Sequence, residues 1–126
     1  MICYFLQYFV VYILAYFMSD FVEECQDVAK RCFEQSCNSG FWNEDRNDGE
    51  AIALIHSELS EVLEALRQGN SSSEHIPEFS AVEEEFADVL IRIMDLSYGG
   101  GWRIFDALEA KMNYNATRGY KHGKQF

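Results

Sequence analysis

The sequence predicts an all-α protein folded as a single domain. The chain contains one proline, and strongly alternating β-branched runs, which would indicate strands, are absent after the first segment. Apolar residues instead recur every three or four positions, as they do on one face of a helix. A length of 126 residues suits one domain. With 48% hydrophobic and 25% charged residues, the composition is that of an ordinary globular protein.

Residues 1–18 form a hydrophobic segment ahead of the predicted domain, residues 19–126. The segment carries no charge, and as a helix it would span ~27 Å, which is near the lower limit for crossing a bilayer. It lacks the basic start and the small-residue cleavage site of a secretory signal. We expect an extra helical segment with one of three roles: a membrane anchor, a buried helix at a subunit contact, or an extension outside the working protein. The third role is suggested by Met18-Ser19-Asp20, which reads like a natural start.

The first helix of the domain is expected to begin near Ser19 or Asp20, because Asp20 with Glu23 resembles a capping box, and to end at Asn38-Ser39-Gly40. A loop with two large aromatic residues follows. A second helix is expected from about Gly49 to Arg67, because Asn47 can accept hydrogen bonds from its first turn as an N-cap. The apolar stripe of the second helix consists of Ile52, Ile55, Leu59, Val62, Leu63 and Leu66.

A third helix is expected to open at Ser80, which forms a capping box with Glu83. It should end at Gly99-Gly100-Gly101, where three glycines permit a sharp turn. A fourth helix is expected from about Trp102 to Tyr114, followed by a basic tail. The apolar stripe of the third helix consists of Val82, Phe86, Val89, Leu90, Ile93 and Leu96.

Two acidic pairs, Glu58 with Glu61 and Glu85 with Asp88, lie at i, i+3 spacing in the second and third helices. Residues three apart share a helix surface, so packing the two helices side by side would bring four carboxylates together. Each pair begins at the edge of its apolar stripe and is expected to point away from the core. Without a cation such a cluster is repulsive, and oxygen-only ligands suit Mg²⁺, or alternatively Mn²⁺. The other interpretation is a solvated acidic face, in which Asp88 pairs with Arg92 at i+4.

Charge is distributed unevenly along the chain. The net charge of −11 argues against a nucleic-acid-binding surface, yet all acidic residues precede Lys111 and four basic residues follow from there. Lys111, Asn115 and Arg118 share a face if the fourth helix continues, and Lys121 and Lys124 come next. Cationic side chains beside a metal suit phosphate chemistry. The alternative is a tail that only improves solubility.

The cysteines indicate a reducing compartment. None of the four forms a CxxC pair or has the spacing of a zinc site. We therefore expect them to be small core residues of a cytoplasmic protein, attached to a membrane only if residues 1–18 are an anchor.

Taken together, these motifs resemble the MazG-like branch of the all-α nucleoside triphosphate pyrophosphohydrolases. That family combines ExxE on one helix with ExxD on the next, here Glu58/Glu61 and Glu85/Asp88 with 23 residues between the pairs. The resemblance covers residues 20–126. One departure is Ser57, where many members carry a further glutamate. The resemblance extends to Gly40-Phe41-Trp42 and to the ending Lys111-Met-Asn-Tyr-Asn115-Ala-Thr-Arg118-Gly-Tyr-Lys121-His122-Gly123-Lys124.

The resemblance implies a four-helix MazG-like bundle completed by oligomerisation, as a homodimer or homotetramer. It also implies Mg²⁺-dependent hydrolysis of nucleoside or deoxynucleoside triphosphates to monophosphate and pyrophosphate, in nucleotide-pool housekeeping. A non-catalytic, membrane-tethered helical interaction module is the alternative. In the enzyme, Glu58, Glu61, Glu85 and Asp88 would be the catalytic metal ligands, and Lys111, Asn115, Arg118, Lys121, Lys124 and Trp42 would bind the substrate. Trp42 or Phe41 would stack on the base; the alternative is that these aromatic residues belong to the core or to a contact.

Overall fold

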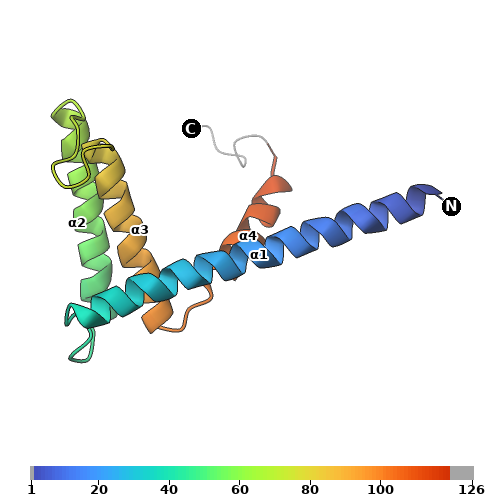
Figure 1. The fold of residues 1–126 in the computed structure, drawn as a ribbon, viewed down its shortest axis with the longest axis horizontal. Helices are drawn as coiled ribbons and strands as arrows, with labels where there is room; N and C mark the ends of the chain where they lie inside the picture. Colours follow the sequence, from blue (N-terminus) through green and yellow to red (C-terminus); the bar gives the residue numbers. More distant parts are fainter. Residues whose placement is uncertain (1, 120–126) are drawn as a thin grey trace. The chain divides into compact units, whose positions relative to one another are not determined.

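The structure is a computed structural model that describes the backbone of residues 2–119 and the side chains of residues 20–119. The described residues form four α-helices and no named strand (Figure 1). The all-α prediction is confirmed for this part of the chain. The helices are α1 (Ile2–Asn38), α2 (Asp48–Arg67), α3 (Ala81–Gly99) and α4 (Ile104–Ala116).

The first helix is longer than the sequence predicts. A start is expected near Ser19 or Asp20, but α1 begins at Ile2 and passes through both positions without a break. Neither glycine nor proline occurs before Gly40, so nothing in the local sequence interrupts the helix. Asp20 therefore caps no helix start. No helix in the described residues is both long enough and apolar enough to cross a lipid bilayer.

The predicted caps of α2 and α3 are confirmed. The Asn47 side chain accepts hydrogen bonds from the backbone N–H groups of Gly49 and Glu50 at the start of α2. At the start of α3, Ser80 and Glu83 form the reciprocal capping box. Such caps satisfy N–H groups that have no partner within the helix, which is why these two helix starts could be placed from sequence alone.

The chain divides into two compact units. One unit consists of Val28–Gly101 and contains the C-terminal end of α1, the loop after it, α2 and α3. The other consists of Met1–Asp27 and Trp102–Phe126 and contains α4. Within the first unit, α2 and α3 pack side by side as a helical hairpin (Figure 1). This hairpin determines where the acidic pairs lie.

The buried faces of α2 and α3 differ from the predicted stripes. On α2 the buried residues are Ala51, Glu58 and Val62, whereas Leu63 and Leu66 of the predicted stripe are about half exposed. The prediction that the acidic pairs point away from the core is therefore wrong for Glu58. The sequence shows which residues are apolar but not which face a neighbouring helix covers, and here α3 covers the face that contains a glutamate. The predicted core residues left exposed are Ile52, Leu59, Leu63, Leu66, Phe86 and Leu90.

Candidate metal and nucleotide site

Three of the four predicted ligands converge between α2 and α3. One carboxylate oxygen from each of Glu58, Glu61 and Glu85 lies within 4.8 Å of the others. Glu58 is buried, with 7% of its surface exposed. The oxygens come from two adjacent helices and are of the type that hard divalent cations prefer. This donor set fits Mg²⁺ or Mn²⁺. We call these three residues the carboxylate cluster.

Asp88, the fourth predicted ligand, is not a member of the carboxylate cluster. Its pKa is raised, first by burial and then by the negative charge of Glu58, so it is close enough to be influenced by the cluster. Burial and the charges of Glu61, Asp88, Glu84 and Glu58 raise the pKa of Glu85 as well. A cation at the cluster would relieve this repulsion.

Three consecutive glutamates at the start of α3 have different partners. Glu83 accepts the backbone N–H of Ser80 in the capping box, which lowers the pKa of Glu83. Glu84 accepts a hydrogen bond of 2.6 Å from the Ser73 hydroxyl, which lowers the pKa of Glu84. Of these three glutamates, only Glu85 belongs to the carboxylate cluster. The helical rotation of 100° per residue sends each side chain in a different direction.

Within residues 20–119, Arg92 is the cation that contacts the carboxylate cluster. Arg92 of α3 donates from Nε to Glu58 Oε1 at 2.6 Å, across to α2. The sequence suggests a different pairing, between Arg92 and Asp88 on the same helix. The contact to Glu58 is understandable, because Glu58 is the most buried carboxylate of the cluster and a buried charge requires a partner.

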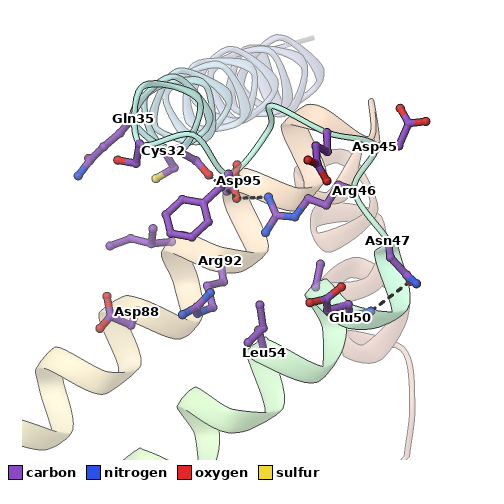
Figure 2. Close-up of a pocket in the computed structure, with 16 residues that line it drawn as sticks. Cys32, Gln35, Asp45, Arg46, Asn47, Glu50, Leu54, Asp88, Arg92 and Asp95 are labelled. Atoms are coloured by element: carbon purple, nitrogen blue, oxygen red, sulfur yellow. Dashed lines mark hydrogen bonds and ion pairs between the residues drawn. The ribbon is translucent and has the colours of Figure 1, made fainter.

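A cavity of about 400 Å³ lies within the unit Val28–Gly101. None of the three residues of the carboxylate cluster lines it, but Arg92, which does, contacts Glu58. Asp88 and Arg92 of α3 line the cavity together with residues of α1, α2 and the loop between them (Figure 2). The volume suits part of a small ligand, since small-molecule pockets usually begin at about 300 Å³. The acidic residues in its lining are Glu44, Asp45, Glu50, Asp88 and Asp95, and the basic ones are Arg46 and Arg92.

Asp95 of α3 holds the loop wall of this cavity in place. Only 4% of its surface is exposed, and its carboxylate accepts hydrogen bonds from Ser36 of α1 at 3.1 Å, Trp42 Nε1 at 2.8 Å and Arg46 at 2.5 Å. Figure 2 shows the Arg46 guanidinium reaching Asp95. Cys32 of α1 also lines the cavity, and burial followed by the charge of Asp95 raises the pKa of its thiol.

Trp42, one of the two aromatic residues predicted to stack on a base, instead packs against other residues of the protein. Besides donating to Asp95, its ring packs edge-on against Phe33 with 5.0 Å between centroids and carries the Arg46 guanidinium 4.7 Å from its centroid. It is not among the residues that line the cavity. Phe41, its neighbour, does line the cavity and is 68% exposed.

The predicted substrate-binding residues of the tail lie in the other unit. Lys111 and Asn115 are on α4, which ends at Ala116, so Arg118 follows the helix instead of extending it. Both cations approach one aromatic ring: Lys111 Nζ lies 4.8 Å and Arg118 Cζ 5.8 Å from the centroid of Tyr114. Lys121 and Lys124 lie outside the described residues. The substrate-binding role of the tail stays a prediction.

Asp95 and the continuation of the polar face along α3 were missed at the level of sequence. Glu85, Asp88, Arg92 and Asp95 recur at i, i+3, i+7 and i+10, which is the spacing of one helix face. The spacing of these polar residues in the sequence could therefore have predicted the polar face of α3. It predicts this face better than the apolar stripe predicts the core.

Comparisons with protein-family models, with curated proteins and with solved structures find no match to this chain.

Proposed function

We propose that this protein hydrolyses nucleoside or deoxynucleoside triphosphates to a monophosphate and pyrophosphate, with a divalent cation at the carboxylate cluster. The observation that carries the proposal is the convergence of three carboxylate oxygens within 4.8 Å on two adjacent helices, where Glu58 is hydrogen-bonded to an arginine that lines a cavity. The resemblance of residues 20–126 to MazG-like pyrophosphohydrolases supports the same reaction.

In the proposed reaction, water attacks the α-phosphorus and the bond from this phosphorus to the oxygen that bridges it to the β-phosphate breaks. Pyrophosphate leaves with the electron pair of that bond. When bound, the divalent cation supplies polarisation of the phosphoryl oxygen. Asp88 is our proposed acceptor of the proton from the attacking water, because it lies outside the carboxylate cluster and lines the cavity.

The cavity is our proposed site for the sugar and base of the nucleotide. Most of the charged side chains that line the cavity are acidic, so most of the cavity is unsuited to a triphosphate. Sugar hydroxyls and base amino groups, in contrast, can donate hydrogen bonds to these carboxylates. Phe41 offers an exposed aromatic ring at this site. We therefore propose Phe41, rather than Trp42, as the residue that contacts the base.

We also propose that the functional form is a homodimer or homotetramer. The apolar side chains of α2 and α3 that are left exposed, Leu63 and Leu66 among them, would be covered in such an assembly. Light scattering of the purified chain should give a mass of two or four subunits, and Leu63→Glu should lower it. A monomer at micromolar concentration would contradict this part of the proposal.

The decisive experiment is a nucleotide panel. The full chain is incubated with Mg²⁺ and each ribo- and deoxyribonucleoside triphosphate, and monophosphate, pyrophosphate and orthophosphate are measured separately. We expect equal amounts of monophosphate and pyrophosphate. Glu61→Gln should lower kcat on the order of 100-fold, because it removes one charged oxygen ligand. Glu64→Gln is the matched control, since Glu64 is on the same helix but contacts Gln68 instead of the carboxylate cluster.

Two results would contradict the proposal. Orthophosphate without monophosphate would indicate a phosphohydrolase of another class. No product from any nucleotide, together with equal Mg²⁺ affinity in wild type and Glu61→Gln, would favour a non-catalytic helical module.

A further inference from the structure

Arg92 links the carboxylate cluster to the cavity. It donates to Glu58 of the cluster at 2.6 Å and also lines the cavity. In Figure 2, Arg92 and Asp88 project from successive turns of α3. Arg92 is part-exposed, at 33% of its side chain, whereas the Glu58 side chain is only 10% exposed. The guanidinium therefore extends from a buried carboxylate toward a space that a ligand can enter.

Only part of the hydrogen-bonding capacity of Arg92 is used by Glu58. A guanidinium has five N–H donors in a planar fork, and the bond to Glu58 uses the one on Nε. Among residues 20–119, the two terminal nitrogens of Arg92 make no hydrogen bond to another side chain. They retain four N–H donors at the edge of the cavity.

Arg46, the other arginine of the cavity lining, already has partners within the protein. Its guanidinium is paired with Asp95 and lies over the ring of Trp42, and its side chain is only 14% exposed. The remaining charged groups of the described lining are carboxylates, which repel an anion. An anionic group that enters the cavity thus has one favourable place, which is beside Arg92 and next to the carboxylate cluster.

We propose that Arg92 binds a phosphate group of the ligand through its terminal nitrogens while Nε holds Glu58. This inference rests on the proposed function, because it assumes a phosphorylated ligand beside the carboxylate cluster. Binding by both edges of the fork fixes the phosphate relative to Glu58. Lysine cannot replace it, because a single ammonium is a point charge without two separated edges.

The test separates anion binding from cation binding. Mg²⁺ alone, and then inorganic pyrophosphate in the presence of Mg²⁺, are titrated calorimetrically into the full chain and into Arg92→Gln. We expect the variant to bind pyrophosphate at least about tenfold more weakly, because its side chain offers no charged hydrogen bond to the phosphate. Mg²⁺ alone should bind to Arg92→Gln at least as tightly as to the wild type, because in the variant no arginine competes with Mg²⁺ for Glu58.

Arg67→Gln is the matched control, because it removes the same charge from an exposed arginine of α2 that lies outside the cavity lining. It should leave both affinities unchanged. Arg92→Lys covers the case in which Arg92→Gln does not fold. It should retain Mg²⁺ binding and still lose several-fold in pyrophosphate affinity, whereas full recovery would show that charge alone suffices and would overturn the proposal.

Other outcomes are equally decisive. Equal pyrophosphate affinity in Arg92→Gln and Arg67→Gln, or a parallel loss of Mg²⁺ and pyrophosphate binding in Arg92→Gln, would overturn the role of Arg92. A wild-type chain that binds no pyrophosphate would do the same. Nucleotide hydrolysis is scored separately. If pyrophosphate binding depends on Arg92 but no nucleotide is hydrolysed, this inference is supported and the proposed enzyme is rejected. If nucleotides are hydrolysed but pyrophosphate binding does not depend on Arg92, the enzyme is supported and this inference is rejected.

Discussion

Asp95 and the carboxylate cluster are two acidic sites in one helical hairpin, and their surroundings differ. Asp95 accepts hydrogen bonds from three residues, two of them neutral donors and one an arginine. In the part of the chain whose side chains are described, the three carboxylates of the cluster share a single arginine, through Glu58. A buried charge with a full set of donors stabilises the fold around it, whereas carboxylates with too few donors repel one another and are suited to bind a cation. The number of donors per carboxylate therefore separates a structural acid from a candidate ligand.

The comparison predicts that removing a carboxylate charge changes the free energy of unfolding in opposite directions at the two sites: it should fall at Asp95 and rise at the carboxylate cluster. The largest effect is expected at Asp95. Asp95→Ala leaves the Arg46 guanidinium and the Trp42 N–H without their acceptor, and should lower the free energy of unfolding by about 3–5 kcal/mol. Chemical denaturation of the full chain measures this. A loss below about 1 kcal/mol would show that the three hydrogen bonds do not hold the loop, and would remove the basis of the comparison.

A smaller loss of unfolding free energy is expected when an added side-chain atom crowds the Trp42 ring, which donates a hydrogen bond to Asp95. A Cβ at Gly99 would overlap the six-membered ring of Trp42, so Gly99→Ala should displace the indole and cost about 1–3 kcal/mol. Gly69→Ala provides a useful contrast, because nothing lies near the added Cβ there, although the φ of +92° at that glycine adds backbone strain. Denaturation followed by tryptophan fluorescence should show a shift in the folded-state emission for Gly99→Ala alone.

The smallest effect, and the one of opposite sign, is expected at Glu85. Burial and neighbouring carboxylates raise the pKa of Glu85 in the folded state, so the folded protein binds this proton more tightly than the unfolded chain. That contribution to stability is complete below the ordinary pKa of glutamate and is lost as the pH rises through the raised pKa. At neutral pH the charge therefore destabilises the fold, and Glu85→Gln should stabilise it by about 0.5 kcal/mol after allowance for solvent screening.

Thermal unfolding with and without Mg²⁺ checks the Glu85 prediction. The gain from Glu85→Gln should shrink as the pH falls toward the ordinary pKa of glutamate, and it should reverse when Mg²⁺ stabilises only the wild type. Glu64→Gln should show neither trend. An unchanged or lower melting temperature for Glu85→Gln at neutral pH without metal would contradict the idea that the carboxylate cluster is short of donors.

The helices themselves could be predicted closely from the sequence. Asn47, Ser80 and Glu83 cap helix starts through hydrogen bonds to residues two or three positions away, so their effect depends on neighbours in the chain. The ends of α2 and α3 follow from glycines in the same way. At Ser19 and Asp20 the predicted helix start is wrong although Asp20 and Glu23 have the spacing of a capping box, because the preceding residues are also helical and such a pair inside a helix marks no boundary.

The site was only partly predictable. The i, i+3 spacing places Glu58 beside Glu61 and Glu85 beside Asp88 whatever the rest of the chain does, because helix geometry is local. That Glu58 is buried, that Asp88 stands apart from the other three, and that Arg92 reaches Glu58 instead of Asp88 all depend on how α2 and α3 are rotated against each other. This rotation is set by contacts between residues far apart in the chain, such as Glu58 and Arg92, which are 34 positions apart, and no local pattern encodes it.

The same division applies to the chain as a whole. Local hydrogen bonds and helical spacing were enough to determine an all-α chain, the starts of α2 and α3 and the pairing of acids within each helix. The tertiary structure alone decided which helix faces became buried, that Trp42 supports Asp95 while Phe41 lines the cavity, and which carboxylates meet. The physical reason is that burial and charge pairing depend on which surfaces come together in space, whereas caps and spacing depend only on neighbours along the chain.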